Sequence, residues 1–468
     1  MSADIVSEAR EAFPEVILPR YEEYYRGVIE ACAEVYRGEP PWGYARRSGL
    51  YGRGYRKMAQ LGCAKVLCDN MAALTFSSQA DIFCGDEECQ KYVDEALRKN
   101  GFWENMPGFF SKAYALGGGA LKVYLADGEV RLDYVDAEGF IPVGCGQGGI
   151  NEGIFRSRYS RGGVYYTLLE RQRFDGRVSV ERALFASKNG TLGDRIPIES
   201  LYPGLEERAE YDELREQCFA YFRPAAANNL AEGSLLGLSC FANCMDTLKA
   251  LDIAFDSFSR EFVLGRKRII VPSSCIRTVV DPDTGNVSRY FDADDEVYQA
   301  LKCDEERDLK ITDNTAELRV TEHVEGINAL LNILCFQTGL SAGTLSFSGS
   351  TGVRTAAEIK SMETRTDTTM QQNRAMAAEV IEKAARAIIA CGIMCGDLSD
   401  REISVRVAFS DRRTVDRSEI IDRNIKLVNA GLRSRLSAVM EVLECSEEEA
   451  ERELEKIERE GSFMAVSG

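Results

Sequence analysis

The sequence contains very few of the residues from which most catalytic centres are built. His323 is the only histidine among 468 residues, whereas most zinc sites, Ser-His-Asp triads and general-base mechanisms use at least one. The glycine triplet at 117–119 is followed by Ala-Leu-Lys, so it lacks the Gly-Lys-Ser/Thr of a phosphate-binding loop. These deficits argue against the commonest enzyme classes, and we interpret His323 as a solvated residue in the first turn of a helix.

Long apolar runs are also missing. No stretch approaches the roughly 18 to 20 uncharged apolar residues of a spanning helix, and the start, MSADIVSEAREAFPEV, carries acids where a signal peptide needs basic and then apolar residues. The fifteen cysteines form no Cys-X-X-Cys pair, and their odd number favours reduced thiols that pack as small hydrophobic side chains. We therefore expect a cytosolic chain with no membrane partner, no metal and no cofactor.

Positive charge is in deficit, since 57 Lys and Arg stand against 75 Asp and Glu and give a net charge of −18. A chain with this net charge does not bind DNA tightly through its overall electrostatic field. A partner that must slide past the protein is still compatible with the charge. With 45% hydrophobic and 28% charged residues the composition is that of an ordered protein. At roughly 150 residues per domain the length suggests about three structural units.

The N-terminal part is predicted to be helical and the next part to be an antiparallel sheet. We expect helices over 4–37, 54–77, 86–99 and 104–116, with the first two separated by Gly-Glu-Pro-Pro-Trp-Gly at 38–43. From 120 to 187 short alternating runs predict successive hairpins, and Asp-Gly at 127–128 and 175–176 are their best turns. We interpret this sheet as purely structural, although five arginines expected to be exposed could form an interaction surface: Arg156, Arg158, Arg161, Arg171 and Arg173.

A helix predicted over 239–264 has an unusually aromatic stripe. The residues expected to pack through this stripe are Phe241, Met245, Leu248, Phe255, Phe258 and Phe262. Asp252 and Asp256 lie one turn apart elsewhere on this helix and could hold a hard cation. Because no third oxygen donor is near them in the sequence, we interpret both as part of a solvated face.

The remaining chain is predicted to alternate between long helices and shorter non-helical segments. Residues 267–320 predict a small α/β insertion between two long helices, the second of which runs over 322–339. A Gly/Ser/Thr-rich stretch, LSAGTLSFSGSTG, leads into a helix expected over 353–391, whose polar first half suits a wet interior or a subunit boundary. One strand and helices near 416–430, 434–443 and 446–460 follow, the last with a capping box of Ser446 and Glu449.

The order of these parts, together with several collinear stretches, resembles the portal proteins of tailed bacteriophages, particularly those of siphophages and prophages of Gram-positive bacteria. The stretches that carry the resemblance are YALGGGALKVYL, RLDYVDAEGFIPV, LLGLSCFANCMDTLKALDIAFDSFSREFVLGRKRIIVP, TAAEI and VNAGLRSRLSAVMEVLECSEEEAERELEKIERE. They extend over nearly the whole chain, and none of them is a catalytic motif.

The resemblance implies an α+β portal fold. A helical and antiparallel-sheet wing would span 1–235, with its helical part over 1–118 and its β part over 119–200, and stem helices would span 236–266 and 321–339. An α/β clip would span 267–320, a tunnel loop 340–352, a long tunnel helix with a wing and crown continuation 353–391, and a C-terminal wing and helical crown region 392–468.

By the same resemblance, the chain would form a homo-dodecameric ring at one capsid vertex, the channel for packaging and ejecting double-stranded viral DNA. Its partners would be the large terminase, the head-completion adaptor of the head-tail connector, and the major capsid and scaffolding proteins. The protein would be a structural part of the virion, not an enzyme, and would be assembled in the host bacterial cytoplasm.

Particular residues acquire roles from this resemblance. The loop expected to contact DNA is Ser346, Phe347, Ser348, Gly349, Ser350 and Thr351. Possible basic rings of the tunnel are Arg354, Lys360 and Arg365. The clip surface for partner proteins is Asp281, Asp283, Arg289, Asp294 and Asp295.

Two other classes of protein stay open on the sequence alone. One is another phage head-tail adaptor or minor capsid protein. The other is a cytosolic enzyme that works through carboxylates and cysteine nucleophiles, which the scarcity of histidine and the lack of phosphate loops disfavour.

Overall fold

A computed structural model of the chain describes residues 5–18, 21–49, 52–76, 80–146, 148–231, 233–265, 269–270, 277–280, 287–290, 312–313, 317–347, 356–409, 417–443 and 447–464. The chain divides into two compact units. The larger comprises Met1–Thr75 and Phe83–Arg406, and the smaller comprises Phe76–Ile82 and Val407–Gly468.

The N-terminal region is less helical than its sequence predicts. Helices α1 (Ile5–Ala12) and α2 (Tyr21–Arg37) replace the single helix expected over 4–37, because Pro14 and Pro19 cannot continue a helical hydrogen-bond ladder. The helix expected from residue 54 is instead a hairpin of β1 (Tyr44–Gly49) and β2 (Gly52–Lys57), and helix α3 (Cys63–Thr75) begins only after it. Glycines at 49, 52 and 54 disfavour a helix there.

Two further helices complete the N-terminal core. Helix α4 (Glu87–Lys99) is capped by Asp86, whose side chain accepts a hydrogen bond from the Cys89 N–H at 2.9 Å. Helix α5 (Phe102–Leu116) packs on α3. The Phe110 side chain is fully buried, and its ring centroid lies 4.4 Å from that of Phe222. This aromatic contact holds α5 against Phe222, a residue of the first of the two sheets described next.

The β-rich part forms two antiparallel sheets. The first has the strand order β12 (Phe219–Phe222), β4 (Gly119–Ala126), β5 (Glu129–Asp136). The second runs β10 (Asp194–Ile196), β9 (Val178–Ser187), β8 (Val164–Phe174), β7 (Gly149–Arg161), β6 (Phe140–Gly146), with β11 (Arg208–Tyr211) also paired to β9. A 3-10 turn, η1 (Ile198–Ser200), follows β10. The predicted hairpin turns are confirmed: Asp127 and Gly128 both adopt positive φ between β4 and β5, and Gly176 does so between β8 and β9.

The expected exposure is confirmed for Arg158, Arg161 and Arg173, whereas Arg156 and Arg171 are half-buried. Arg156 and Arg158 both pair with Glu8 of α1, a carboxylate that is 1% exposed. Arg171 lies 2.5 Å from Glu152 and 2.9 Å from Glu181. The partners of these arginines come from distant residues or neighbouring strands, which strand alternation alone does not reveal.

Two antiparallel helices carry a small β region in the middle of the chain. Helix α6 (Met245–Leu264), preceded by the 3-10 turn η2 (Ala242–Cys244), packs along α7 (Val320–Gln337). Between them β13 (Ile269–Ile270) pairs with β16 (Thr312–Asp313), and β14 (Arg277–Val280) pairs with β15 (Val287–Tyr290). The helical part expected in this insertion lies outside the described residues.

Helix α8 (Ala356–Cys395) is 40 residues long, close to the 39 residues predicted. Its second half is rich in buried apolar side chains, among them Val380, Ile381 and Ile388, and packs against β12 and β4. Among the residues that the structure describes, no helix is long and apolar enough to cross a membrane.

The smaller unit is mainly helical. It contains α9 (Arg417–Asn429), α10 (Arg435–Leu443) and α11 (Glu447–Met464). Strand β17 (Val405–Phe409) pairs with β3 (Ala80–Cys84), and the rings of Phe76 and Phe409 meet edge to face. Ser446 of the predicted capping box lies outside the described residues.

Candidate functional site

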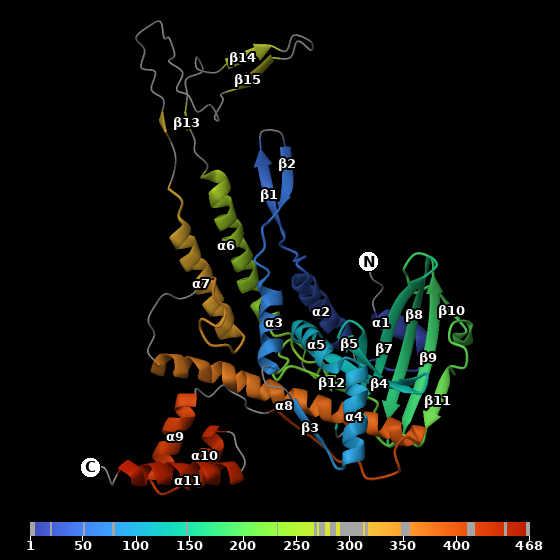
Figure 1. Cartoon of the computed structure of the whole chain (residues 1–468). Helices are drawn as coiled ribbons and strands as arrows, with labels where there is room; N and C mark the ends of the chain where they lie inside the picture. The colour runs from blue at the N-terminus through green and yellow to red at the C-terminus, as the bar shows by residue number, and fades with distance from the viewer. Residues whose placement is uncertain are drawn as a thin grey trace. The chain divides into compact units, whose positions relative to one another are not determined.

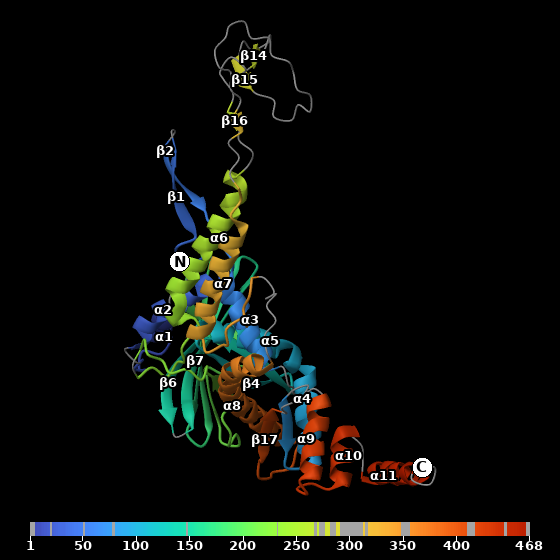
Figure 2. The ribbon, with the colours of Figure 1, turned by 90° about the vertical axis from the view of Figure 1, so that its left-hand side faces the viewer.

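Helix α6 lies between α7 on one face and the segment that carries the β1–β2 hairpin on the other (Figures 1 and 2). The two faces use different residues of α6. Asp252 and Asp256 bind the hairpin segment, whereas Thr247 and Glu261 bind α7. This helix is therefore the structural centre of the region where the sequence placed most candidate residues.

Asp252 and Asp256 are buried anchors, so their interpretation as a solvated face is wrong. They are 8% and 7% exposed. Asp252 accepts hydrogen bonds from the Trp42 indole N–H at 2.9 Å and from the Leu61 N–H at 3.0 Å. Asp256 accepts from the Arg56 guanidinium, at 2.6 Å for Nη1, and from the Ala59 N–H at 3.0 Å.

The two carboxylates differ in their electrostatics. Burial raises the pKa of Asp252, and its hydrogen bonds from Trp42 and Leu61 only partly oppose that rise. The Arg56 hydrogen bond holds the pKa of Asp256 below its ordinary value against a smaller effect of burial. Because protein donors already bind both oxygens of each carboxylate, the pair serves as an anchor. Among the described residues no group of three potential ligands could hold a metal ion.

Helices α6 and α7 are joined at both ends and apolar between them. Thr247 Oγ1 donates to Gln337 Oε1 at 2.8 Å, and Arg319 Nη2 lies 3.1 Å from Glu261 Oε2. Apolar side chains buried between these ends are Leu248, Leu251, Ile327, Leu331 and Leu334. The polar contacts fix the antiparallel register of the pair.

His323 lies in the first turn of α7 as the sequence indicates, but it is not fully solvated. Its side chain is 18% exposed, its Nε2 atom lies 3.7 Å from Glu261 Oε2, and its ring centroid is 5.9 Å from that of Phe258. The imidazole therefore packs between the two helices.

Burial of the predicted stem-packing residues decreases along α6. Phe241 is fully buried, but it precedes α6 because the chain enters the helix through a 3-10 turn at 242–244. Leu248 is buried, whereas Met245, Phe255 and Phe258 are half-buried. Phe262 is 45% exposed. The aromatic stripe thus leaves the core at its C-terminal end.

The first part of the predicted loop packs on this helix pair. The Phe347 ring lies 6.2 Å from Phe255 and 5.9 Å from Phe258, and its N–H donates to Asn328 Oδ1 at 2.8 Å. Asn332 accepts from the Gly343 N–H at 2.9 Å. Ser346 is exposed. The other four loop candidates, Ser348, Gly349, Ser350 and Thr351, lie outside the described residues.

The same segment is fastened to α8. Thr369 Oγ1 donates to the Gly339 carbonyl at 2.7 Å, and the Ser341 N–H donates to Thr366 Oγ1 at 2.8 Å. Arg365 donates to the Phe336 carbonyl at 2.9 Å, and its guanidinium carbon lies 4.7 Å from the centroid of the Phe336 ring. Of the possible basic residues, only Arg365 has a described side chain; those of Arg354 and Lys360 lie outside the description.

The candidate clip surface is described only in part. Residue 289 pairs with Thr278 in the β14–β15 register, which is all that the structure gives for Arg289. Asp281, Asp283, Asp294 and Asp295 lie outside the described residues.

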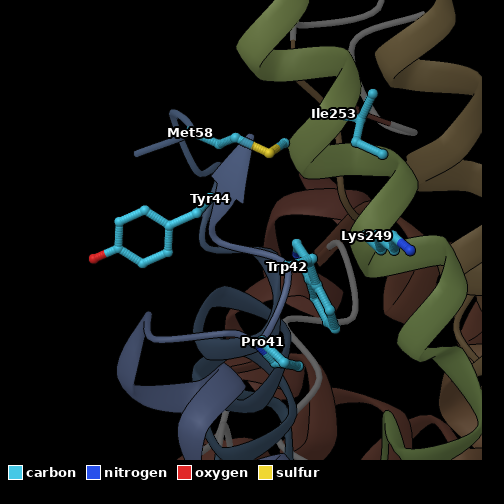
Figure 3. A pocket seen from close by; sticks show the side chains of 6 residues that line it. All are labelled: Pro41, Trp42, Tyr44, Met58, Lys249 and Ile253. Atoms are coloured by element: carbon cyan, nitrogen blue, oxygen red, sulfur yellow. The ribbon is translucent and has the colours of Figure 1, made fainter. Parts of the chain in front are cut away.

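A surface pocket that the sequence did not predict lies where the hairpin segment meets α6 (Figure 3). It has a volume of about 430 Å³ and is lined by Pro41, Trp42, Tyr44, Met58, Lys249 and Ile253. Figure 3 shows Trp42 and Met58 reaching toward α6, whereas Tyr44 is directed away from it. The glycines at 49, 52 and 54, between short runs that carry Tyr and Arg, are a signal in the sequence that could have revealed the hairpin.

Comparison with protein families matches residues 54–462 to the family described as "Phage portal protein, SPP1 Gp6-like". No curated protein matches the sequence. Among solved structures, a chain of the "Virion of native gene transfer agent (GTA) particle" is similar, with a TM-score of 0.42 and 11% identity over 81% of this chain and 88% of that one. A chain of the "Neck of native GTA particle computed with C12 symmetry" gives 0.40 and 11% over 94% and 98%. Because these scores are low, the assignment rests on the family match.

That match covers most of the chain, and the chain therefore belongs to the phage portal protein family, whose members are structural proteins of a capsid vertex.

Proposed function

We propose that copies of this chain form a dodecameric ring at one capsid vertex, through which double-stranded viral DNA is packaged and later ejected. The observation that carries the proposal is the family match over residues 54–462. In this arrangement 1–235 and 392–468 serve as wing and crown, α6 and α7 as stem, and 267–320 as clip.

The charge of the chain supports a channel through which DNA moves. A ring built from subunits of −18 each is strongly acidic and does not adsorb the phosphate backbone over its whole surface. The uncharged loop residues 346–351 contact the duplex without reading bases. Arg354, Lys360 and Arg365 supply a limited number of cations in the sequence that leads into and begins α8.

Anchoring of the segment after α7 supports the same assignment. Asn328 and Asn332 bind its backbone from α7, while Thr366 and Thr369 bind it from α8. A loop at a channel wall needs such fixed ends, because the passing polymer exerts force on whatever it touches. The protein thus acts by shape and charge and is not an enzyme.

The partners follow from this role. The clip, including Asp281, Asp283, Arg289, Asp294 and Asp295, docks the large terminase during packaging and the head-completion adaptor afterwards. The major capsid and scaffolding proteins contact the wing. We place assembly in the host bacterial cytoplasm and the finished ring in the virion.

The test is the mass and shape of the purified protein, measured by light scattering after size exclusion and by negative-stain imaging. A ring of twelve subunits with an axial hole is the expected result. A stable monomer or dimer, also in the presence of the scaffolding protein, contradicts the proposal and favours an adaptor.

A further inference from the structure

The β1–β2 hairpin is basic and aromatic in an otherwise acidic chain. Residues 44–57 contain five basic residues and no acidic one. Tyr44 and Tyr55 are 65% and 70% exposed, and Lys57 is exposed as well. In the register Tyr44 pairs with Lys57, and residues opposite each other across an antiparallel pair share a face.

Tyr44 of this face lies at the rim of the pocket beside α6, with its ring directed away from the helix (Figure 3). Lys249 and Ile253 line the pocket, and Ile253 is 47% exposed although it is apolar. We call the set Tyr44, Tyr55, Lys57, Lys249 and Ile253 the hairpin surface. Exposed aromatic and apolar side chains rimmed by charge are typical of a protein interface.

The opposite side of the helix pair presents a complementary stripe. Glu322, Glu325, Ile333 and Phe336 recur at helical spacing on the face of α7 away from the buried Ile327. Ile333 is 47% and Phe336 is 67% exposed, and both glutamates are exposed. No Lys or Arg occurs in 320–337. We call these four residues the α7 outer face.

The two surfaces also lie at similar heights along the axes of α6 and α7, which we call their level. Thr247 binds Gln337 at one end and Glu261 binds Arg319 at the other, so Lys249 lies near the level of Ile333, and Ile253 lies near the level of Ala329, one turn towards the start of α7. Arg56 binds Asp256, and the hairpin extends from there along the C-terminal half of α6 (Figure 1), which is the level of the two glutamates.

We propose that the hairpin surface of one copy binds the α7 outer face of a second copy, with Phe336 and Ile333 at the pocket and the glutamates at the basic hairpin. The proposal rests on the ring proposed above. Because the contact joins two different surfaces of the chain, it is heterologous, and repeated heterologous contacts form a ring when their rotation closes, as in the dodecamer proposed above. The proposal takes the ring axis to run parallel to α6, so that rotation from one copy to the next keeps groups at the same height along the helix and brings the matched groups together.

Photo-crosslinking tests this contact directly. We replace Ile253 with p-benzoylphenylalanine, mix isotopically light and heavy copies, and map crosslinks in the assembled full-length protein by mass spectrometry. Crosslinks between light and heavy chains that end in 329–337 are expected. The same probe at Tyr165, which is 48% exposed on β8, should give none there. Crosslinks from residue 253 only within one chain, or only to DNA or another capsid protein, overturn the proposal.

Charge reversal gives a second readout. Lys57→Glu or Glu325→Lys should each raise the concentration at half assembly by about tenfold, because like charges then face each other. The double variant should return it to within about twofold of the original. Lys188→Glu, at an exposed position of the β9–β10 connection, is the control for net charge, and circular dichroism checks folding.

The outcomes separate this inference from the proposed function. If the unmodified chain forms a ring but residue 253 crosslinks elsewhere and the double variant shows no rescue, the interface is wrong and the ring stands. If the unmodified chain forms no ring, the proposed function and this inference fail together.

Discussion

The indole N–H of Trp42 donates to Oδ2 of Asp252 at 2.9 Å, across 210 positions of sequence. With the Arg56–Asp256 pair it fastens the hairpin segment to α6. A helix with two buried carboxylates on one face and a partner helix on the other is held from both sides, which suits an element proposed to withstand a moving polymer.

Replacement of Asp252 should therefore loosen this attachment. Asp252→Ala leaves the N–H groups of Trp42 and Leu61 without their acceptor and should lower the free energy of unfolding by about 2–4 kcal/mol. Urea denaturation followed by tryptophan emission measures the change. Asp246→Ala, at an exposed position of the same helix, should stay within about 0.5 kcal/mol. Equal effects of the two substitutions contradict the anchoring role.

Glu170 should make part of the stability of the larger unit depend on acid pH. Burial alone would raise its pKa, but Lys122 at 2.6 Å and Arg182 at 2.8 Å bring it down to about 2. A carboxyl with a lowered pKa stabilises the fold above its unfolded pKa and loses that contribution as the pH falls through its folded pKa. The chain should therefore lose stability as the pH falls from about 4.5 to about 2.

Denaturation of the protein and of Glu170→Gln across this range checks the prediction. The variant should be less stable near neutral pH and should show a shallower acid dependence. An unchanged slope means that other carboxyl groups account for the acid sensitivity.

Gly339 should tolerate a side chain poorly for two separable reasons. Its φ is +77°, and a Cβ atom there would lie 2.8 Å from Thr369 Oγ1. Gly396 has a φ of +81° and open space around it. Gly396→Ala should cost about 1 kcal/mol from backbone conformation alone, and Gly339→Ala clearly more, because it also disturbs the Thr369 contact. Thermal unfolding of both variants gives the difference, and equal losses exclude a role for that contact.

Deletion of 346–350 should spare ring formation yet impair DNA packaging, if these residues line the channel. Negative-stain imaging and an in vitro packaging assay measure the two properties. Because Phe347 packs on Phe255 and Phe258, Phe347→Ala separates loss of packing from loss of the loop and should cost about 1–3 kcal/mol of stability. Normal packaging by the deletion variant removes the loop from the mechanism.

Local patterns in the sequence determined much of the architecture. The Asp-Gly pairs at 127–128 and 175–176 predict hairpin turns because few other residues adopt the required positive φ. The long periodic run near 353–391 predicts α8, and the order of parts predicts the family. The turns and the long helix depend on neighbours within a few residues, so a short stretch of sequence is enough to predict them.

Only the tertiary structure decided the environment of single side chains. Asp252 and Asp256 resemble a solvated helix face until Trp42 and Arg56 are brought to them from about 200 residues upstream. Arg156 and Arg158 likewise become partners of buried Glu8 only when α1 covers the second sheet. A polar side chain can be buried only where other groups replace its hydrogen bonds to water, because an unpaired buried polar group costs free energy. Those groups come from distant parts of the sequence, so only the complete fold decides where they lie.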